Sequence, residues 1–240
     1  MVNDNGLFQR AELLLGEEAM IRLGEIKVIV FGVGGVGSWC VEALVRTGVR
    51  HLTIVDNDCV STSNINRQLM ATTKTVGQVK VEALKQRMLD INPDVEITAL
   101  HQVFTEETAD SFDIGNYDYV IDAIDSLKDK ALLIVMACNT KARLFSSMGA
   151  ALKMDPTRVK VDEFWKVKGD PLARALRNHF KKRKIFPKKK FKCVFSDELL
   201  KNKKMMDGVQ QHCNGSLVHI TAIFGFTLAA LVVRDATEVQ

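Results

Sequence analysis

The stretch KVIVFGVGGVGSW, residues 27–39, constrains the fold of this chain more than any other feature. A run rich in β-branched residues leads into Gly32, Gly34 and Gly37, spaced G-x-G-x-x-G, and a helical pattern follows. Glycines at this spacing allow a tight turn and a close approach of the backbone to a phosphate, which also meets the positive end of the helix. The stretch therefore predicts a nucleotide-binding loop, and we count Gly35 among its binding residues.

Asp56 stands at the end of the next predicted strand, 19 residues after Gly37. A carboxylate at this place in a Rossmann-like unit accepts hydrogen bonds from ribose hydroxyls. The loop and Asp56 alone do not tell a redox dinucleotide such as NAD from ATP.

Strand patterns and helix patterns alternate along the chain. This order predicts an α/β fold with a doubly wound, mainly parallel, Rossmann-like sheet. The expected strands are 27–32, 51–58, 95–104, 117–125 and 143–150, and the expected helices are 9–25, 38–49, 75–93 and 130–142.

Residues 1–240 are expected to form a single domain, in which 157–215 would be a basic, irregular insertion or C-terminal cap. Its run from Arg177 to Lys192 has nine lysines or arginines and no acid, with Phe180, Phe186 and Phe191 between them. Such a run is either a solvated face or a contact surface for RNA. We expect the three phenylalanines to pack in the core rather than to stack on bases.

Composition indicates a cytoplasmic protein. No basic, then apolar, leader opens the chain, the net charge is only +4, and the five cysteines are scattered without a CxxC pair. Residues 217–233 are apolar, with one histidine and no charge. We expect them to form a buried helix or a strand–helix pair. Stable membrane insertion is not expected, although weak membrane association through this segment stays open.

The residues after Asp56 favour ATP over NAD. Arg67 and Lys80 follow closely, and a triphosphate attacked at its α-phosphorus needs several cations to neutralise the developing charge. No residue stands out as a partner for hydride transfer. Of the two carboxylates in DAID, Asp122 is expected on the strand as structural support and Asp125 just past its end.

The stretches GVGGVGSW, DND, NINRQ and DAID together resemble the ThiF/MoeB-like adenylating enzymes, which are related to ubiquitin-activating enzymes. The resemblance implies that Asp56 binds ribose and that Asn64 and Arg67 contact phosphate and metal. It also implies that Lys80 binds phosphate and that Asp125 holds Mg²⁺ and organises the reacting phosphate. Arg67, Lys80 and Asp125 would thus be catalytic as well as binding residues.

Arg10, in LFQRAELL, resembles the arginine of these enzymes that reaches across a dimer interface to the partner's ATP. The resemblance therefore implies a homodimer in which Arg10 is a catalytic residue of the neighbouring site.

Further stretches, among them VGQVKVEALKQRMLDINP, SSMGA and FKCVFSDE, are similar to the tRNA threonylcarbamoyladenosine dehydratase family. That family uses ATP to cyclise threonylcarbamoyladenosine beside the anticodon. The similarity implies that ATP and Mg²⁺ are the cofactors and that the anticodon arm of tRNA is the substrate. Whether a monovalent cation also binds, and whether a sulfur-relay protein is a partner, stays open. The alternative is an adenylyltransferase for the C-terminus of a ubiquitin-like sulfur carrier, which the missing CxxC zinc pairs disfavour.

Overall fold

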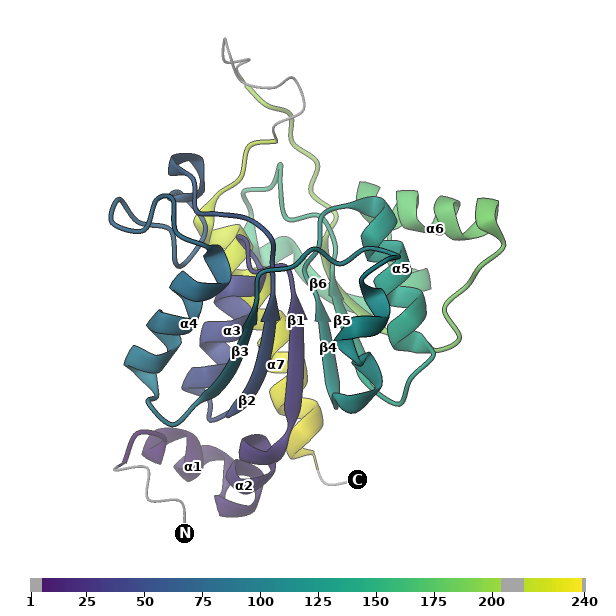
Figure 1. Ribbon diagram of the computed structural model, residues 1–240. Helices are drawn as coiled ribbons and strands as arrows, with labels where there is room; N and C mark the ends of the chain where they lie inside the picture. The colour runs from purple at the N-terminus through teal and green to yellow at the C-terminus, as the bar shows by residue number, and fades with distance from the viewer. Residues whose placement is uncertain (1–5, 204–213, 239–240) are drawn as a thin grey trace.

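A seven-stranded sheet forms the centre of the protein in the computed structural model, which describes residues 6–203 and 214–238. The strand order is β3-β2-β1-β4-β5-β7-β6, and every neighbouring pair is parallel except β6 with β7 (Figure 1). The predicted doubly wound, mainly parallel α/β sheet is confirmed. The strands are β1 Lys27–Phe31, β2 His51–Val55, β3 Glu96–Leu100, β4 Tyr119–Asp122, β5 Arg143–Ser147, β6 Val159–Glu163 and β7 Lys192–Ser196.

The strand order reverses between β1 and β4. From β1 the chain adds β2 and then β3 on one side, and it returns to place β4 on the other side of β1. Phe31 lies opposite Asp122 in this pair, so the loops after β1 and β4 leave the sheet side by side. Ligands of open α/β sheets bind at such a switch point, outside the carboxyl ends of the strands.

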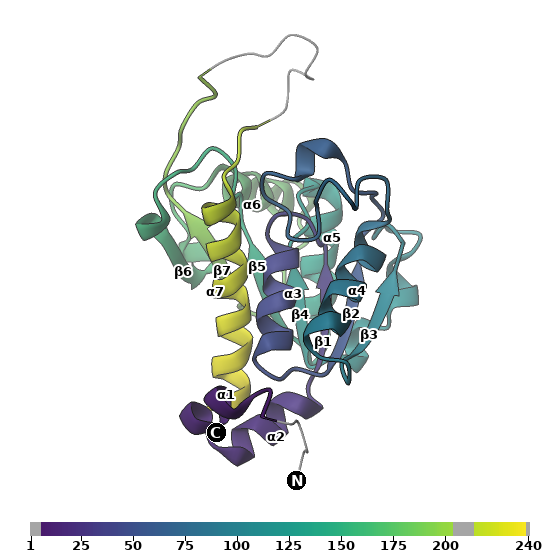
Figure 2. The same ribbon diagram turned by 90° about the vertical axis from the view of Figure 1, so that its left-hand side faces the viewer.

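Helices cover both faces of the sheet. Helix α3 (Gly37–Arg46), α4 (Lys80–Ile91) and α7 (Val218–Thr237) lie on one face, and α5 (Leu127–Cys138) and α6 (Pro171–Arg183) lie on the other (Figures 1 and 2). Side chains of β1 alternate between the two buried clusters: Val28 and Val30 face α3, whereas Ile29 and Phe31 face α5. Burial on both faces explains why the strand reads as a continuous apolar run.

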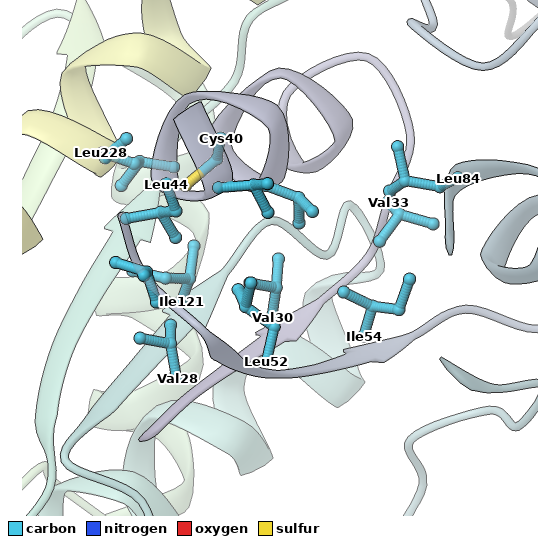
Figure 3. Close-up of a cluster of buried hydrophobic side chains, with 14 of the residues drawn as sticks. Val28, Val30, Val33, Cys40, Leu44, Leu52, Ile54, Leu84, Ile121 and Leu228 are labelled. Atoms are coloured by element: carbon cyan, nitrogen blue, oxygen red, sulfur yellow. The ribbon is translucent and has the colours of Figure 1, made fainter. Parts of the chain in front are cut away.

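The cluster beneath α3 joins elements that are far apart in the chain. Val30, Leu52 and Ile121 of three adjacent strands meet Leu44 of α3, and Leu228 of α7 closes the cluster (Figure 3). Helix α7 is thus the buried C-terminal helix that the sequence predicts. By length and composition alone it could cross a membrane, but half of its most apolar 18-residue stretch is buried in the protein.

The chain begins with two short helices instead of the expected single helix over 9–25. Helix α1 (Gln9–Leu15) ends at Gly16, whose φ of 83° breaks the helix, and α2 (Glu17–Glu25) leads into β1. Both helices lie at the amino end of the sheet (Figures 1 and 2).

Residues 157–215 were expected to be irregular, and the structure corrects this within the part that it describes. They contain β6, α6 and β7, and β7 pairs with β5 in the main sheet. The apolar part of β7 is only three residues long, and β6 is a polar edge strand, so neither gives a clear strand pattern. Phe180 and Phe191 are buried as expected, whereas Phe186 is half exposed against Trp165.

Element bounds differ elsewhere by a few residues. The helix predicted over 75–93 begins at Lys80, and the strand predicted over 95–104 ends at Leu100. The strand predicted over 117–125 is Tyr119–Asp122, which leaves Asp122 on the strand and Asp125 in the following loop, as expected.

Candidate active site

The glycine loop joins the end of β1 to the start of α3. Gly32 has a φ of 84°, and a Cβ there would lie 2.8 Å from the Ala123 carbonyl oxygen after β4. A Cβ on Gly37 would lie 1.8 Å from the Gly32 carbonyl oxygen. These two glycines are therefore required by the fold of the loop, whereas Gly34 and Gly35 line its open side at ordinary or slightly tight distances from Gln68 and Thr221.

Four backbone N–H groups at the start of α3 are available to a ligand. Among the described residues, no hydrogen bond uses the N–H of Gly34, Gly35, Val36 or Gly37 as donor. Unpaired N–H groups at a helix N-terminus, together with the helix dipole, form an anion site. The loop thus offers what a nucleotide phosphate requires.

Asp56 fixes the glycine loop against β2. One carboxylate oxygen accepts a hydrogen bond from the Val33 N–H at 2.9 Å, and the other accepts from the Asp58 N–H at 2.9 Å. Each oxygen retains a second lone pair, so Asp56 can still accept a hydrogen bond from a hydroxyl group. Its place just after β2 is the one predicted for the ribose-binding carboxylate.

The segment around Arg67 lies over the start of α3. The Trp39 indole donates a hydrogen bond to the Arg67 carbonyl oxygen at 3.0 Å, and the Leu69 N–H donates to the Ser38 hydroxyl at 3.2 Å. Arg67 is half-buried, its Cγ packs over Gly35, and its guanidinium donates to the Ser63 carbonyl at 2.9 Å. The structure therefore brings Arg67 to the glycine loop.

Asn64 has a structural task in the same segment. Its side chain is buried, and its amide oxygen accepts a hydrogen bond from the Ser61 N–H at 3.0 Å, which closes the turn that carries Arg67. The predicted phosphate contact would be made by its remaining amide N–H groups.

Lys80 begins α4 and points back to the loop after β2. Its Nζ lies 2.7 Å from the Asp58 carboxylate, and its backbone N–H donates to the Asp58 carbonyl. Lys80 is buried although Asp58 is largely exposed. Asp58, which belongs to the DND turn, thus holds Lys80 at the carboxyl edge of the sheet.

A buried ion pair supports the loop that carries Asp125. Lys130 and Asp122 are both fully buried and lie 2.8 Å apart, and the Ser146 hydroxyl donates to Asp122 at 2.6 Å. Asp122 also accepts from the Ile124 N–H, while Lys130 donates to the Ile124 carbonyl oxygen. Both backbone groups of Ile124 are therefore fixed, and the exposed Asp125 follows directly.

Sequence reasoning missed Lys130 and Ser146. Lysine in KALLIVMAC reads as a surface residue at a helix start, and only the contact with Asp122 explains its burial. The signal that could have found it is the exclusively apolar run of residues 131–138 that follows it.

Arg10 is not part of this group. It is exposed on α1, at the amino end of the sheet, whereas the glycine loop lies at the carboxyl end (Figure 1). Within one chain the structure therefore separates Arg10 from the other predicted site residues.

A second polar group lies further along the same edge, after β5 and β7. Lys153 is buried and donates to the Ser196 and Glu198 carbonyls at 2.9 and 2.8 Å. Burial lowers the pKa of Lys153 and raises the pKa of Asp170, which lies next to Gly149. These groups extend the polar edge of the sheet beyond the glycine loop.

The described residues contain no cluster of three or more His, Cys, Asp or Glu side chains that could hold a metal alone. A Mg²⁺ ion, which is usually bound through substrate phosphates and one or two carboxylates, does not need such a cluster. Asp125, which is exposed, follows the end of β4 by three residues and so lies in the loop that leaves the sheet at the switch point.

The fold and the site define a Rossmann-like nucleotide-binding protein. The chain belongs to the ThiF family, whose sequence model matches residues 8–238. It is 45% identical over 191 residues to a Bacillus subtilis protein named tRNA threonylcarbamoyladenosine dehydratase, covering 80% of this chain and 74% of that one.

Two crystal structures of the E. coli tRNA N6-threonylcarbamoyladenosine dehydratase, TcdA, are also similar. The complex with ATP superposes with a TM-score of 0.87 and the complex with AMP with 0.89. Each is 33% identical, and each match covers 98% of this chain and 96% of the E. coli chain.

Proposed function

We propose that this protein uses ATP to dehydrate threonylcarbamoyladenosine in tRNA, through an acyl-adenylate. The observation that carries the proposal is the glycine loop, whose four N–H groups have no partner among the described residues, together with the Arg67 side chain that packs against Gly35. Lys80, which is paired with Asp58 after β2, supports the same interpretation. The names of the relatives, and the ATP and AMP bound in the two crystal structures of the E. coli protein, support the same chemistry.

The reaction would proceed in two steps. The threonyl carboxylate attacks the α-phosphorus of ATP, which forms the acyl-adenylate and releases pyrophosphate. The carbamoyl nitrogen or oxygen of the same nucleoside then attacks the acyl carbon, and the bond to AMP breaks. Because nucleophile and electrophile belong to one molecule, proximity favours ring closure, and no cysteine is required.

Each side chain has a task in this proposal. The N–H groups of the loop and Asp56 bind phosphate and ribose, while Arg67 and Lys80 neutralise the charge that develops on the phosphate oxygens. Asp125 would hold Mg²⁺, which would neutralise phosphate charge when bound. Asn64 supports Arg67, and a monovalent cation stays an untested addition.

The adenylyltransferase alternative would place a protein C-terminus at the same edge. The chain lacks CxxC pairs, and the relatives described above carry dehydratase names. A tRNA substrate also gives a reason for the basic run Arg177–Lys192. We therefore favour tRNA.

The remaining partners belong to the same proposal. We propose a homodimer in which the partner's Arg10 approaches the site, and a cytoplasmic location, where tRNA is modified. A sulfur-relay protein stays a prediction, and we assign no surface of the described residues to it. The packing of α7 against α3 and α2 gives the apolar C-terminal segment a place within the fold, so the proposal needs no membrane association.

Asp125→Ala tests the reacting site. The purified protein should convert ATP to AMP and pyrophosphate in the presence of modified tRNA, and nucleoside mass spectrometry should detect the dehydrated nucleoside. Asp125 is exposed, so its replacement should lower turnover by at least about a hundredfold and leave the thermal unfolding midpoint unchanged. Release of ADP and phosphate would refute adenylation, and near-normal turnover would remove Asp125 from the site.

A further inference from the structure

A basic groove lies at the amino end of the sheet, opposite the glycine loop. It has a volume of about 440 Å³ and lies between the end of α5, the start of β5 and the start of β7. Among the residues that the structure describes, its charged lining residues are Lys141, Arg143, Lys189, Lys190, Lys192 and Asp235.

The one acidic residue of the basic groove is already paired. Asp235 forms an ion pair with Arg143 and accepts a hydrogen bond from the Tyr119 hydroxyl at 2.7 Å. The four lysines of the groove are therefore not neutralised by its carboxylate, and cations gathered in a groove concentrate the positive potential there.

The segment that leads into β7 carries most of the groove's lysines, and its position is fixed by contacts with the rest of the protein. Lys189 is bonded to the Thr140 carbonyl, and Phe191 is buried and stacks on Phe164 with ring centroids 4.9 Å apart. Because side chains alternate along an extended chain, burial of Phe191 turns Lys190 and Lys192 outward together. Both side chains are exposed, and neither ammonium group has a hydrogen bond or an ion pair among the described residues.

The basic run connects this groove with the reaction edge. Helix α6 lies near the carboxyl end of the sheet, and the chain after it descends along the side of the molecule to the start of β7 (Figure 1). Lys181, Lys182 and Arg183 stand at the end of α6, and Lys190 and Lys192 stand in the groove. Cations spread over this path suit an extended polyanion better than one small anion.

We propose that the basic groove binds the phosphate backbone of the tRNA at a distance from the nucleoside that reacts. The inference rests on the proposed function. Strand β7 alone, five residues long, separates the two edges by about 16 Å. Only a nucleic acid that extends beyond the reacting loop can occupy both sites.

The test compares a triple variant of the groove with a double variant as control, and it uses two RNA substrates. Lys141→Gln/Lys190→Gln/Lys192→Gln removes groove charges without breaking a contact described above. Lys27→Gln/Lys85→Gln is the control, because Lys27 also lies at the amino end of the sheet and Lys85 lies on α4, both outside the groove. The substrates are full-length modified tRNA and a single-stranded loop fragment that carries the same modified adenosine.

The groove variant should raise the KM for full-length tRNA by about tenfold or more, with kcat and the KM for ATP unchanged. It should also flatten the slope of log affinity against log salt by about two units, since each phosphate contact contributes about 0.7 to 0.9. The KM for the loop fragment should not change, and the control variant should behave like the wild type.

Several outcomes would overturn the inference: an equal effect of the control variant, an equal loss with the loop fragment, or a change in oligomeric state in the groove variant alone. Loss of binding to anionic vesicles with unchanged tRNA affinity would instead assign the groove to a membrane surface. If the wild type converts neither RNA, the proposed function fails. The salt dependence of binding to unmodified tRNA then decides the groove by itself.

Discussion

Gly37 and Gly34 of the glycine loop contribute differently to stability and to ATP binding, and alanine substitutions distinguish the two contributions. In Gly37→Ala the added Cβ would meet the Gly32 carbonyl oxygen at 1.8 Å, so the backbone must shift. We expect a loss of about 1 to 3 kcal/mol of unfolding free energy together with loss of ATP binding.

Gly34→Ala is the matched variant, because its Cβ would lie at an ordinary 3.6 Å from Gln68. The fold should be stable to within about 1 kcal/mol, yet a methyl group at the open side of the loop keeps phosphate from the backbone. ATP affinity should fall about tenfold or more, as one charged hydrogen bond is worth about 1.5 to 3 kcal/mol. Urea unfolding and ATP titration measure the two effects, and equal stability losses in both variants would contradict the separation.

The role of Lys130 also depends on its environment. Lys130→Met leaves the Asp122 carboxylate fully buried without its cation, which should cost about 3 to 5 kcal/mol. The double variant Lys130→Met/Asp122→Asn removes both charges and should regain part of this loss. Denaturant unfolding measures both, and a single variant within about 1 kcal/mol of the wild type would refute the role of the pair.

At the scale of elements, Glu42 links two helices of the same layer. Its carboxylate is buried on α3 and accepts hydrogen bonds from Arg46 at 2.8 Å and from Arg87 of α4 at 2.7 Å. Burial raises the pKa of Glu42, but the hydrogen bonds from both arginines outweigh burial, so its pKa lies below the usual value.

This shift predicts a pH dependence of stability. A carboxylate with a lowered pKa in the folded state stabilises above its unfolded pKa of about 4.3 and loses this contribution as the pH falls through the folded pKa. Glu42→Gln should therefore be less stable than the wild type at neutral pH, and the difference should shrink below about pH 4. Urea midpoints across pH measure it, with the exposed Glu82→Gln as control. A stability difference that is constant with pH would contradict the prediction that the ionised carboxylate of Glu42 stabilises the fold.

At the scale of the whole molecule, the distant Arg10 makes a shared site testable. If Arg10 acts on the partner's ATP, Arg10→Ala and Lys80→Ala should each abolish activity. Mixed and exchanged, they should regain up to about a quarter of the wild-type activity, because half of random dimers are heterodimers, each with one intact site.

The control mixes Lys80→Ala with Asp125→Ala. Both residues belong to the same site, so each site of a mixed dimer keeps one defect, and activity should stay absent. Subunit exchange is verified by native mass spectrometry. Absence of recovery with Arg10→Ala, despite proven exchange, would leave Arg10 outside the site.

The sequence by itself determined the sheet class and the nucleotide loop. The strand, the glycines and the start of α3 are contiguous, so their periodicity and spacing contain the geometry. Asp56 and Asp125 follow strand ends, and parallel strands bring such ends to one edge.

Only the tertiary structure decided the features that depend on distant segments. Strand β7 became visible through its pairing with β5, because five residues of mixed polarity have no distinctive period. The burial of Lys130 depends on a carboxylate from another strand, and the basic groove joins Lys141 to Lys190 across two separate segments. Such groupings arise from long-range packing, which a local pattern cannot encode.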